Sequence, residues 1–221
     1  MCGRFALTVS PENISKYFHV EDVSEGIHQY NIAPGQLIKS ILKMPDGRRH
    51  ISSMKWGLIP SWTKDPSKGV KTINARAETV HTKPSFRNAI KFRRCIIPAS
   101  GFYEWEKVEK RKVPYYIRLK SNEPIGFAGL WDKWKGDNGS VIESCTILTT
   151  SSNNLLKPIH DRMPVIIHPD EYELWLNRDM NDPDKLKSIF QPYPSEMLTL
   201  YRVSNIVNKT DYDKKDCIEP T

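Results

Sequence analysis

Residues 37–58 read LIKSILKM-PDG-RRHISSMKWGL, two strand-like runs on either side of Pro45-Asp46-Gly47. Proline fixes the φ angle that a turn requires, and glycine accepts the positive φ that other residues avoid. Turn residues between two runs of this kind favour antiparallel pairing. The stretch therefore predicts a β-hairpin with strands over Leu37–Met44 and Arg48–Leu58.

Similar runs continue along the chain and are separated by turn residues such as Gly136-Asp137-Asn138-Gly139. They predict further strands over Val113–Lys120, Ile125–Trp131, Val141–Thr150, Met163–His168 and Met197–Ser204. About eight strands with antiparallel turns are typical of a curled or barrel-like sheet. We therefore expect one sheet-based domain.

Helical patterning is limited to short segments. Pro11–Phe18 has Ser10 as its expected N-cap and proline at the first helical position, where the missing N–H has no cost. Partial 3.6-residue patterns predict helices over Ala75–Val80, Ser85–Lys91, Asp170–Asn177 and Pro183–Gln191. These helices are expected to pack around the sheet.

Composition limits the class of protein. The 221 residues carry 33 Lys+Arg and 26 Asp+Glu, a net charge of +7, with 38% apolar residues, which suffices for a folded core. A positive balance favours polyanions only weakly. We expect one domain over residues 1–207, a polar and flexible tail over residues 208–221, no membrane span, and a cytoplasmic location. The four cysteines form no C-x-x-C pair, so we expect reduced thiols, no metal site and no cofactor.

Cys2 follows the initiator methionine. Removal of Met1 would leave an α-amine beside a thiol, and because the reference pKa of an α-amine is about 7.7–8.0, about a tenth of it is unprotonated at pH 7. Such an aminothiol condenses with an aldehyde to an imine, and the thiol then closes a five-membered thiazolidine. The alternative is that Cys2 is a buried, inert residue of an early strand.

Three polar segments offer partners for this chemistry. Asn74 and Arg76 lie at the expected start of a helix, where a phosphate is favoured, although Asn74 also suits a simple helix cap. Glu104 lies among large aromatic residues, so desolvation would raise its pKa and suit it to proton transfer; the alternative is an ion pair with an arginine. His160 precedes an apolar strand and is either an acid/base group or structural.

The segment Trp56-Gly57-Leu58-Ile59-Pro60-Ser61-Trp62 carries two indoles close to Lys55 and Lys64. Aromatic rings beside cations form a platform for single-stranded bases. Tryptophan also commonly fills the corner of a core. The sequence leaves both interpretations open for Trp56 and Trp62.

Taken together, MCGRFALT, YNIAPGQ, WGLIPSW, NARAET, RCIIPASGFYEW, FAGLWDKW and IHDRMPVII resemble the SRAP family of SOS-response-associated peptidases, which includes abasic-site processing proteins. The resemblance runs from Met1 to about Val203. It implies a single α+β domain with a curved, mainly antiparallel, barrel-like sheet and short peripheral helices.

The resemblance also implies a function. Mature Cys2 would form a thiazolidine crosslink with the ring-opened sugar of an abasic site in single-stranded DNA, including single/double-strand junctions, as a monomer that associates with the nucleoid when bound. Asn74 and His160 would position the sugar, Glu104 would assist imine formation, and the tryptophan segment would stack on bases. Arg4, Arg76 and Arg162 would contact phosphates. The family name leaves open a peptidase activity that removes the initiator methionine.

Two other classes of protein remain compatible with the sequence. One is an N-terminal-nucleophile amidohydrolase, in which Cys2 attacks an amide with its own amine as base. The other is a non-catalytic reader of modified bases, in which Cys2 is incidental. Reaction with an aldehyde separates these classes from the thiazolidine hypothesis.

Overall fold

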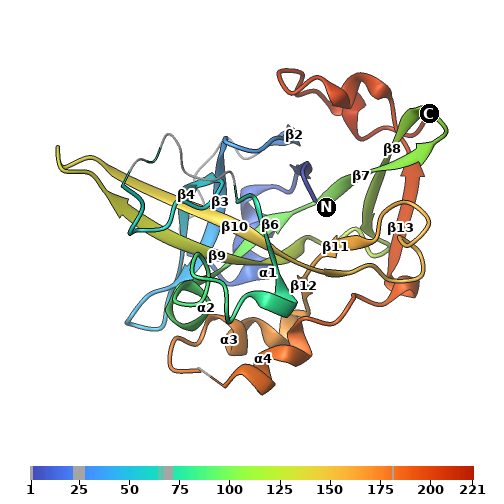
Figure 1. The fold of residues 1–221 in the computed structure, drawn as a ribbon. Helices are drawn as coiled ribbons and strands as arrows, with labels where there is room; N and C mark the ends of the chain where they lie inside the picture. The colour runs from blue at the N-terminus through green and yellow to red at the C-terminus, as the bar shows by residue number, and fades with distance from the viewer. Residues whose placement is uncertain (1, 22–27, 65, 67–71, 181) are drawn as a thin grey trace.

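The computed structural model describes residues 2–21, 28–64, 66, 72–180 and 182–221 (Figure 1). The described strands are β1 (Phe5–Leu7), β2 (Gln29–Ile32), β3 (Leu37–Lys43), β4 (Arg49–Trp56), β5 (Asn74–Arg76), β6 (Arg94–Ala99), β7 (Gly101–Val108), β8 (Arg111–Leu119), β9 (Ile125–Lys135), β10 (Val141–Ser151), β11 (Arg162–Pro164), β12 (Ile166–Ile167) and β13 (Leu198–Arg202). The α-helices are α1 (Pro11–Phe18), α2 (Ala89–Phe92), α3 (Tyr172–Leu176) and α4 (Pro183–Ile189), and the 3₁₀ turns are η1 (Ala77–Thr79), η2 (Pro169–Glu171), η3 (Ser195–Met197), η4 (Asn205–Asn208) and η5 (Lys215–Cys217).

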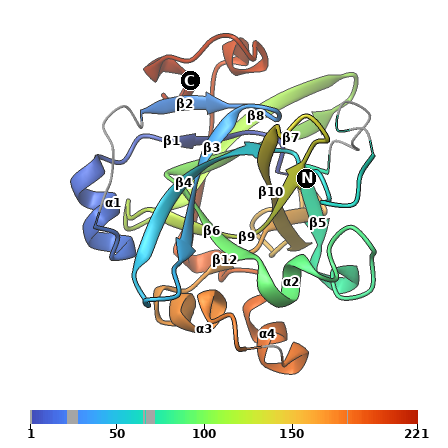
Figure 2. The same cartoon turned by 90° about the vertical axis from the view of Figure 1, so that its left-hand side faces the viewer.

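Five strands close into a barrel in the order β10-β4-β3-β6-β9, because β9 pairs with β10 again. All pairs in this ring are antiparallel except β4 with β10. Figure 2 shows these strands arranged as a ring. A second sheet has the order β13-β8-β7-β1-β2. The expected α+β fold with a curved, mainly antiparallel, barrel-like sheet and short helices is confirmed.

The first predicted hairpin is present as β3 and β4, with Lys43 opposite Arg49. Gly47 adopts φ 87°, and its N–H donates to the Met44 carbonyl oxygen at 3.0 Å. Inside the barrel, the Phe5 ring packs edge-on against Trp56 and Phe127, with centroids 5.2 and 5.9 Å apart. Burial of these large rings supplies much of the hydrophobic stabilisation of the barrel.

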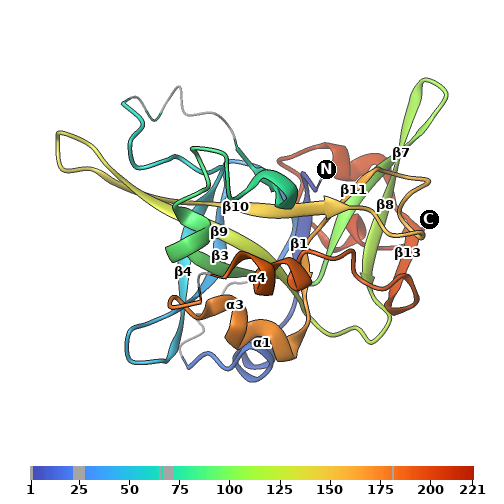
Figure 3. The ribbon, with the colours of Figure 1, turned by 60° about the horizontal axis from the view of Figure 1, so that its bottom comes forward.

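The helices are peripheral. In α1, the Ser10 hydroxyl accepts the N–H of Asn13 at 3.3 Å, which confirms the predicted cap. Helices α3 and α4 lie together on one side of the barrel (Figures 1 and 3). Trp175 of α3 is fully buried, and its indole nitrogen donates to the Cys95 carbonyl oxygen at 2.8 Å. Within the described residues, no helix is both long and apolar enough to cross a membrane.

One predicted helix is wrong and another is shorter than predicted. The segment Ala75–Val80 does not form an α-helix: residues Asn74–Arg76 form β5, and a single 3₁₀ turn follows. Of the predicted helix Ser85–Lys91, only Ala89–Lys91 is helical, as part of α2, and residues 85–88 form turns. β5 runs parallel to β10, with Asn74 opposite Ile147 and Arg76 opposite Thr149. Tertiary pairing with a long strand thus overrides a weak local helical pattern.

Residues 208–221 differ from the expected flexible tail. The Asp213 carboxylate accepts the backbone N–H groups of Tyr30 and Asn31, and Cys217 is fully buried against the aromatic face of the second sheet. The segment is attached both by hydrogen bonds and by a small apolar contact. Composition alone cannot distinguish such contacts from solvation.

Candidate functional site

Four predicted residues from distant parts of the sequence lie close together. The Asn74 side-chain nitrogen donates to the Cys2 carbonyl oxygen at 2.9 Å. The Glu104 carboxylate raises the pKa of the Cys2 thiol, and His160 in turn acts electrostatically on Glu104. One hydrogen bond from a side-chain amide and two electrostatic interactions therefore connect Cys2, Asn74, Glu104 and His160.

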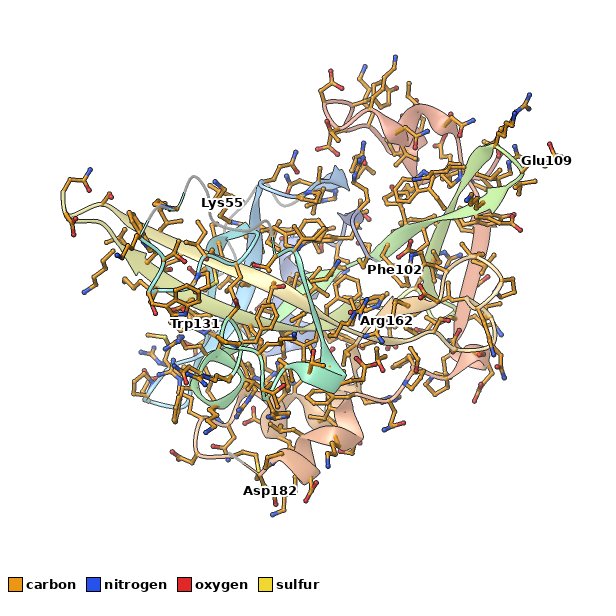
Figure 4. The ribbon with its side chains drawn as sticks, viewed as in Figure 1. Lys55, Phe102, Glu109, Trp131, Arg162 and Asp182 are labelled. Carbon is orange, nitrogen blue, oxygen red and sulfur yellow. The ribbon has the colours of Figure 1, made fainter. Side chains whose placement is uncertain are left out.

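Strand pairing explains this convergence. β1 pairs with β7, with Phe5 opposite Phe102, and continuation of this antiparallel register places Glu104 opposite Gly3. On the other side, β10 pairs with both β5 and β11, which brings Asn74 and the loop before Arg162 to the same part of the molecule. Figure 4 shows Arg162 and Phe102 in the middle of the molecule, far from Glu109 at the tip of the β7–β8 hairpin.

The Cys2 side chain is fully buried, and its sulfur lies 4.0 Å from the Arg4 carbonyl oxygen. Burial raises the pKa of the Cys2 thiol well above its ordinary value, and the neighbouring Glu104 carboxylate raises it further. The thiol is therefore held protonated at neutral pH, so a nucleophilic role requires a base to take its proton. Met1, whose removal the aminothiol hypothesis requires, lies outside the described residues.

Glu104 is only 3% exposed, and its burial raises the pKa of its carboxyl group, an effect that nearby His160 reduces. The large aromatic residues around Glu104 in the sequence predict this desolvation. A carboxyl group with a raised pKa exchanges protons closer to neutral pH than an exposed one. Glu106 differs, since it is half-buried and accepts a hydrogen bond from the Tyr115 hydroxyl at 3.0 Å.

The His160 ring is oriented by its own loop. The backbone N–H of Arg162 donates to Nδ1 at 3.0 Å, which puts the proton of a neutral imidazole on Nε2. The Asp161 carboxylate also lies 2.9 Å from Nδ1 and binds it only when the imidazole is protonated. Neutral His160 can therefore donate a hydrogen bond through Nε2 while Nδ1 keeps its bond from the Arg162 N–H.

The three arginines have different environments. Arg4, expected to contact DNA phosphates, is only 8% exposed, and its Nη1 donates to Asn31 Oδ1 and the Val207 carbonyl oxygen, both at 2.6 Å. Arg162 forms a bidentate ion pair with Glu78, at 2.5 and 3.0 Å. Arg76 is exposed. Of the three guanidinium groups, that of Arg76 is the most accessible to a phosphate.

The two tryptophans differ in exposure. Trp56 is fully buried in the barrel, and its indole nitrogen donates to the Ile73 carbonyl oxygen at 2.9 Å. The prediction that Trp56 stacks on DNA is therefore wrong, because its ring faces are covered by core side chains. Trp62 is 64% exposed. Its turn is fixed by Asp132, which accepts the Ser61 N–H at 2.9 Å.

Two residues of the site region were not assigned from the sequence. Glu78 holds Arg162, and the fully enclosed Asn31 holds Arg4. Both lie inside motifs quoted above, NARAET and YNIAPGQ, so their position in those motifs was an available signal. No cluster of three or more His, Cys, Asp or Glu side chains suited to a metal ion occurs among the described residues.

Comparisons with known proteins place the whole chain among named relatives. The chain is 44% identical over 223 residues to the abasic site processing protein YoqW of Bacillus subtilis, covering 99% of each. It is 31% identical to the abasic site processing protein HMCES of Xenopus tropicalis, covering 99% of this chain and 78% of that protein. A crystal structure of a protein from Bacteroides thetaiotaomicron matches all of both chains with a TM-score of 0.91 and 28% identity.

The family model described as SOS response associated peptidase matches residues 1–210. That match covers both sheets and all four residues of the candidate site. The chain belongs to the SOS response associated peptidase (SRAP) family.

Proposed function

We propose that this chain processes abasic sites in single-stranded DNA by forming a thiazolidine crosslink between mature Cys2 and the ring-opened deoxyribose. The observation that carries the proposal is the convergence of Cys2, Asn74, Glu104 and His160 from four separate parts of the sequence. The names of the relatives, which are abasic site processing proteins, support the same substrate.

The proposed reaction has two bond-forming steps. The α-amine nitrogen of Cys2 attacks the aldehyde carbon, and the resulting carbinolamine loses water to give an imine. The Cys2 thiol then loses its proton and adds to the same carbon, while the imine nitrogen gains a proton. The products are a thiazolidine and one water molecule, so no oxidant or other reactant is needed.

The environment of each residue suits a particular step. Glu104 has a raised pKa and can deliver the proton that the departing hydroxyl requires, then accept the proton of the thiol. His160, with its proton on Nε2, is suited to donate a hydrogen bond to the sugar oxygen. Asn74 donates to the Cys2 carbonyl oxygen, and its own Oδ1 is buried with no hydrogen-bond partner among the described residues, so it can accept a hydrogen bond from the sugar hydroxyl or the amine.

DNA would bind through contacts outside this group. Exposed Arg76 is the proposed main phosphate contact, and exposed Trp62 the proposed stacking residue at a single/double-strand junction. Arg162 contacts the DNA strand next to His160. Buried Arg4 chiefly fixes the position of β1. An intact duplex is a poor substrate because the sugar has to leave the stack before Cys2 can reach it.

The test is incubation of the protein with an oligonucleotide carrying one abasic site, followed by denaturing electrophoresis. Wild type is expected to give a heat-stable adduct, and Cys2→Ala to give none while retaining most of its affinity. Cys217→Ala, which removes another buried thiol that has no part in the proposed chemistry, is the matched control and should crosslink like wild type.

A second variant carries a non-removable residue ahead of Cys2, which blocks the α-amine and keeps the thiol. It should also fail to form the stable adduct. An undiminished adduct from Cys2→Ala would falsify the thiazolidine assignment. Amide cleavage without any aldehyde adduct would instead favour an amidohydrolase, and selective binding without any adduct would favour a reader of modified bases.

A further inference from the structure

A cavity of about 380 Å³ lies beside the candidate site. Its wall is formed by η1, the end of β10 and the segment that follows α4. The side chains that matter for the argument are Ala77, His81, Thr150, Ser151, Phe190 and Gln191. None of them has a role in the proposed crosslinking chemistry.

The charged side chains at the cavity already have partners. Glu78 is held by the bidentate ion pair with Arg162, and Lys187 lies 2.6 Å from the Asp184 carboxylate. Burial and the nearby positive charge of Lys187 lower the pKa of His81, so this ring is neutral at pH 7. The cavity therefore suits an uncharged group better than a phosphate.

Its remaining surface combines a half-buried aromatic ring with neutral hydrogen-bonding groups. That ring is the neutral imidazole of His81, which lies against the buried Phe190 ring at a centroid distance of 6.1 Å, and Phe190 in turn packs on Trp175 at 6.2 Å. Thr150 and Ser151 add hydroxyl groups, and Gln191 adds an amide. A held aromatic ring next to neutral donors and acceptors is the chemistry that binds an unstacked nucleobase.

The position of the cavity matches the path of a bound strand. Ala77 directly follows the exposed Arg76, and Thr149, opposite Arg76 in the sheet, directly precedes Thr150. Ala77 lies three positions after Asn74, which is about 10 Å at the rise of about 3.3 Å per strand residue. At about 3.4 Å per stacked nucleotide, this distance corresponds to about three nucleotides.

We propose that this cavity binds one unpaired nucleobase of the damaged strand, within about three nucleotides of the abasic sugar. The inference rests on the proposed function for the identity of the strand. It adds a base-binding subsite, so that the protein holds the lesion by a neighbouring base as well as by phosphates.

The test is a base-removal scan with a single-stranded oligonucleotide that carries an unreactive tetrahydrofuran in place of the abasic sugar. A second tetrahydrofuran is placed at each of the three positions on either side, and affinity is measured by fluorescence anisotropy. Because loss of one base–aromatic stack weakens binding by about 5- to 100-fold, wild type should show such a loss at one position.

Two variants connect that position to the cavity. Ser151→Phe fills it, and removal of the sensitive base should then change affinity less than about twofold, because the interaction is already lost. Gln191→Ala, which deletes only the amide, should reduce the effect partly. Gln29→Ala, on β2, is the matched control and should retain the full wild-type pattern.

The proposal is overturned if wild type tolerates base removal equally at every position, or if Ser151→Phe retains the position-specific loss. The scan uses an unreactive sugar, so its outcome does not depend on crosslinking. If the protein crosslinks but its affinity does not depend on where a base is removed, the subsite is refuted and the proposed function stands. A position-specific loss without crosslinking supports the subsite and refutes the thiazolidine chemistry.

Discussion

Asn31→Ala tests whether the C-terminal segment is an integral part of the fold. The Asn31 side chain accepts from Arg4 at 2.6 Å and donates to the carbonyl oxygens of Lys209 and Tyr212 at 2.9 and 2.6 Å. A hydrogen bond to a charged group contributes about 1.5–3 kcal/mol, and each neutral one about 0.5–1.5 kcal/mol. Since Asn31 is 1% exposed, water cannot replace these partners without rearrangement.

The expected loss is about 3 kcal/mol of the free energy of unfolding, a large part of the stability of an ordinary domain. With a urea slope of about 3 kcal/mol per molar for a chain of this size, the midpoint of unfolding should fall by about 1 M. Limited proteolysis should cut the variant after residue 207 much faster than wild type, because the segment loses its main anchor.

Asn13→Ala is the matched control, since Asn13 is an exposed residue of α1, and its midpoint should stay close to wild type. Asp213→Asn weakens the same attachment from the other side, because the Asp213 carboxylate accepts two backbone N–H groups. If Asn31→Ala unfolds at the wild-type urea concentration, or if residues 208–221 are cleaved equally fast in both proteins, the reasoning fails.

The remaining predictions concern the site. Trp62→Ala should weaken binding to single-stranded DNA about 5- to 100-fold with little change in stability. Trp56→Ala should instead lower the free energy of unfolding by about 3–5 kcal/mol. The opposite pattern in anisotropy and urea titrations would contradict the assignment. Arg76→Ala should reduce the slope of log affinity against log salt by about 0.7, and an unchanged slope would mean that Arg76 contacts no phosphate. Burial raises the pKa of Glu104. From the ordinary Glu pKa of about 4.3 up to the raised value, the folded protein therefore binds more protons than the unfolded chain. The stability of wild type should fall as the pH rises through this range. Glu104→Gln should lack that decline, so its stability relative to wild type should increase with pH in urea titrations, while its single-turnover crosslinking should slow by about 10²- to 10⁴-fold; a pH-independent difference in stability would argue against a raised pKa.

The hairpin, the capped first helix and the aromatic setting of Glu104 were all predictable from local sequence. Pro45 and Gly47 fix a turn through their own φ preferences, and Ser10 caps a helix whose proline follows it directly. Glu104 lies in a run of bulky neighbours, so its desolvation follows from chain position. The physical basis is local in each case, because the partners lie within a few residues.

The conformation of the Asn74 segment was not predictable, because β5 exists only through its pairing with β10, more than seventy residues away. The same holds for the two indoles of Trp56 and Trp62. They lie in one short segment, and only the closed barrel decides that the first is enclosed and the second exposed. Exposure depends on what packs against a residue, which a local pattern does not contain.

The sequence by itself indicated the proposed reactive group, since the hypothesis of an N-terminal aminothiol depends only on Cys2 being the second residue. It also determined the types of residue that could assist it. Only the tertiary structure decided which of them reach it, how deeply Arg4 is buried, and that the polar C-terminal segment is anchored through Asn31. The physical reason is that electrostatic and hydrogen-bonding interactions act over a few ångströms of space, and the pairing of strands distant in the sequence sets those distances.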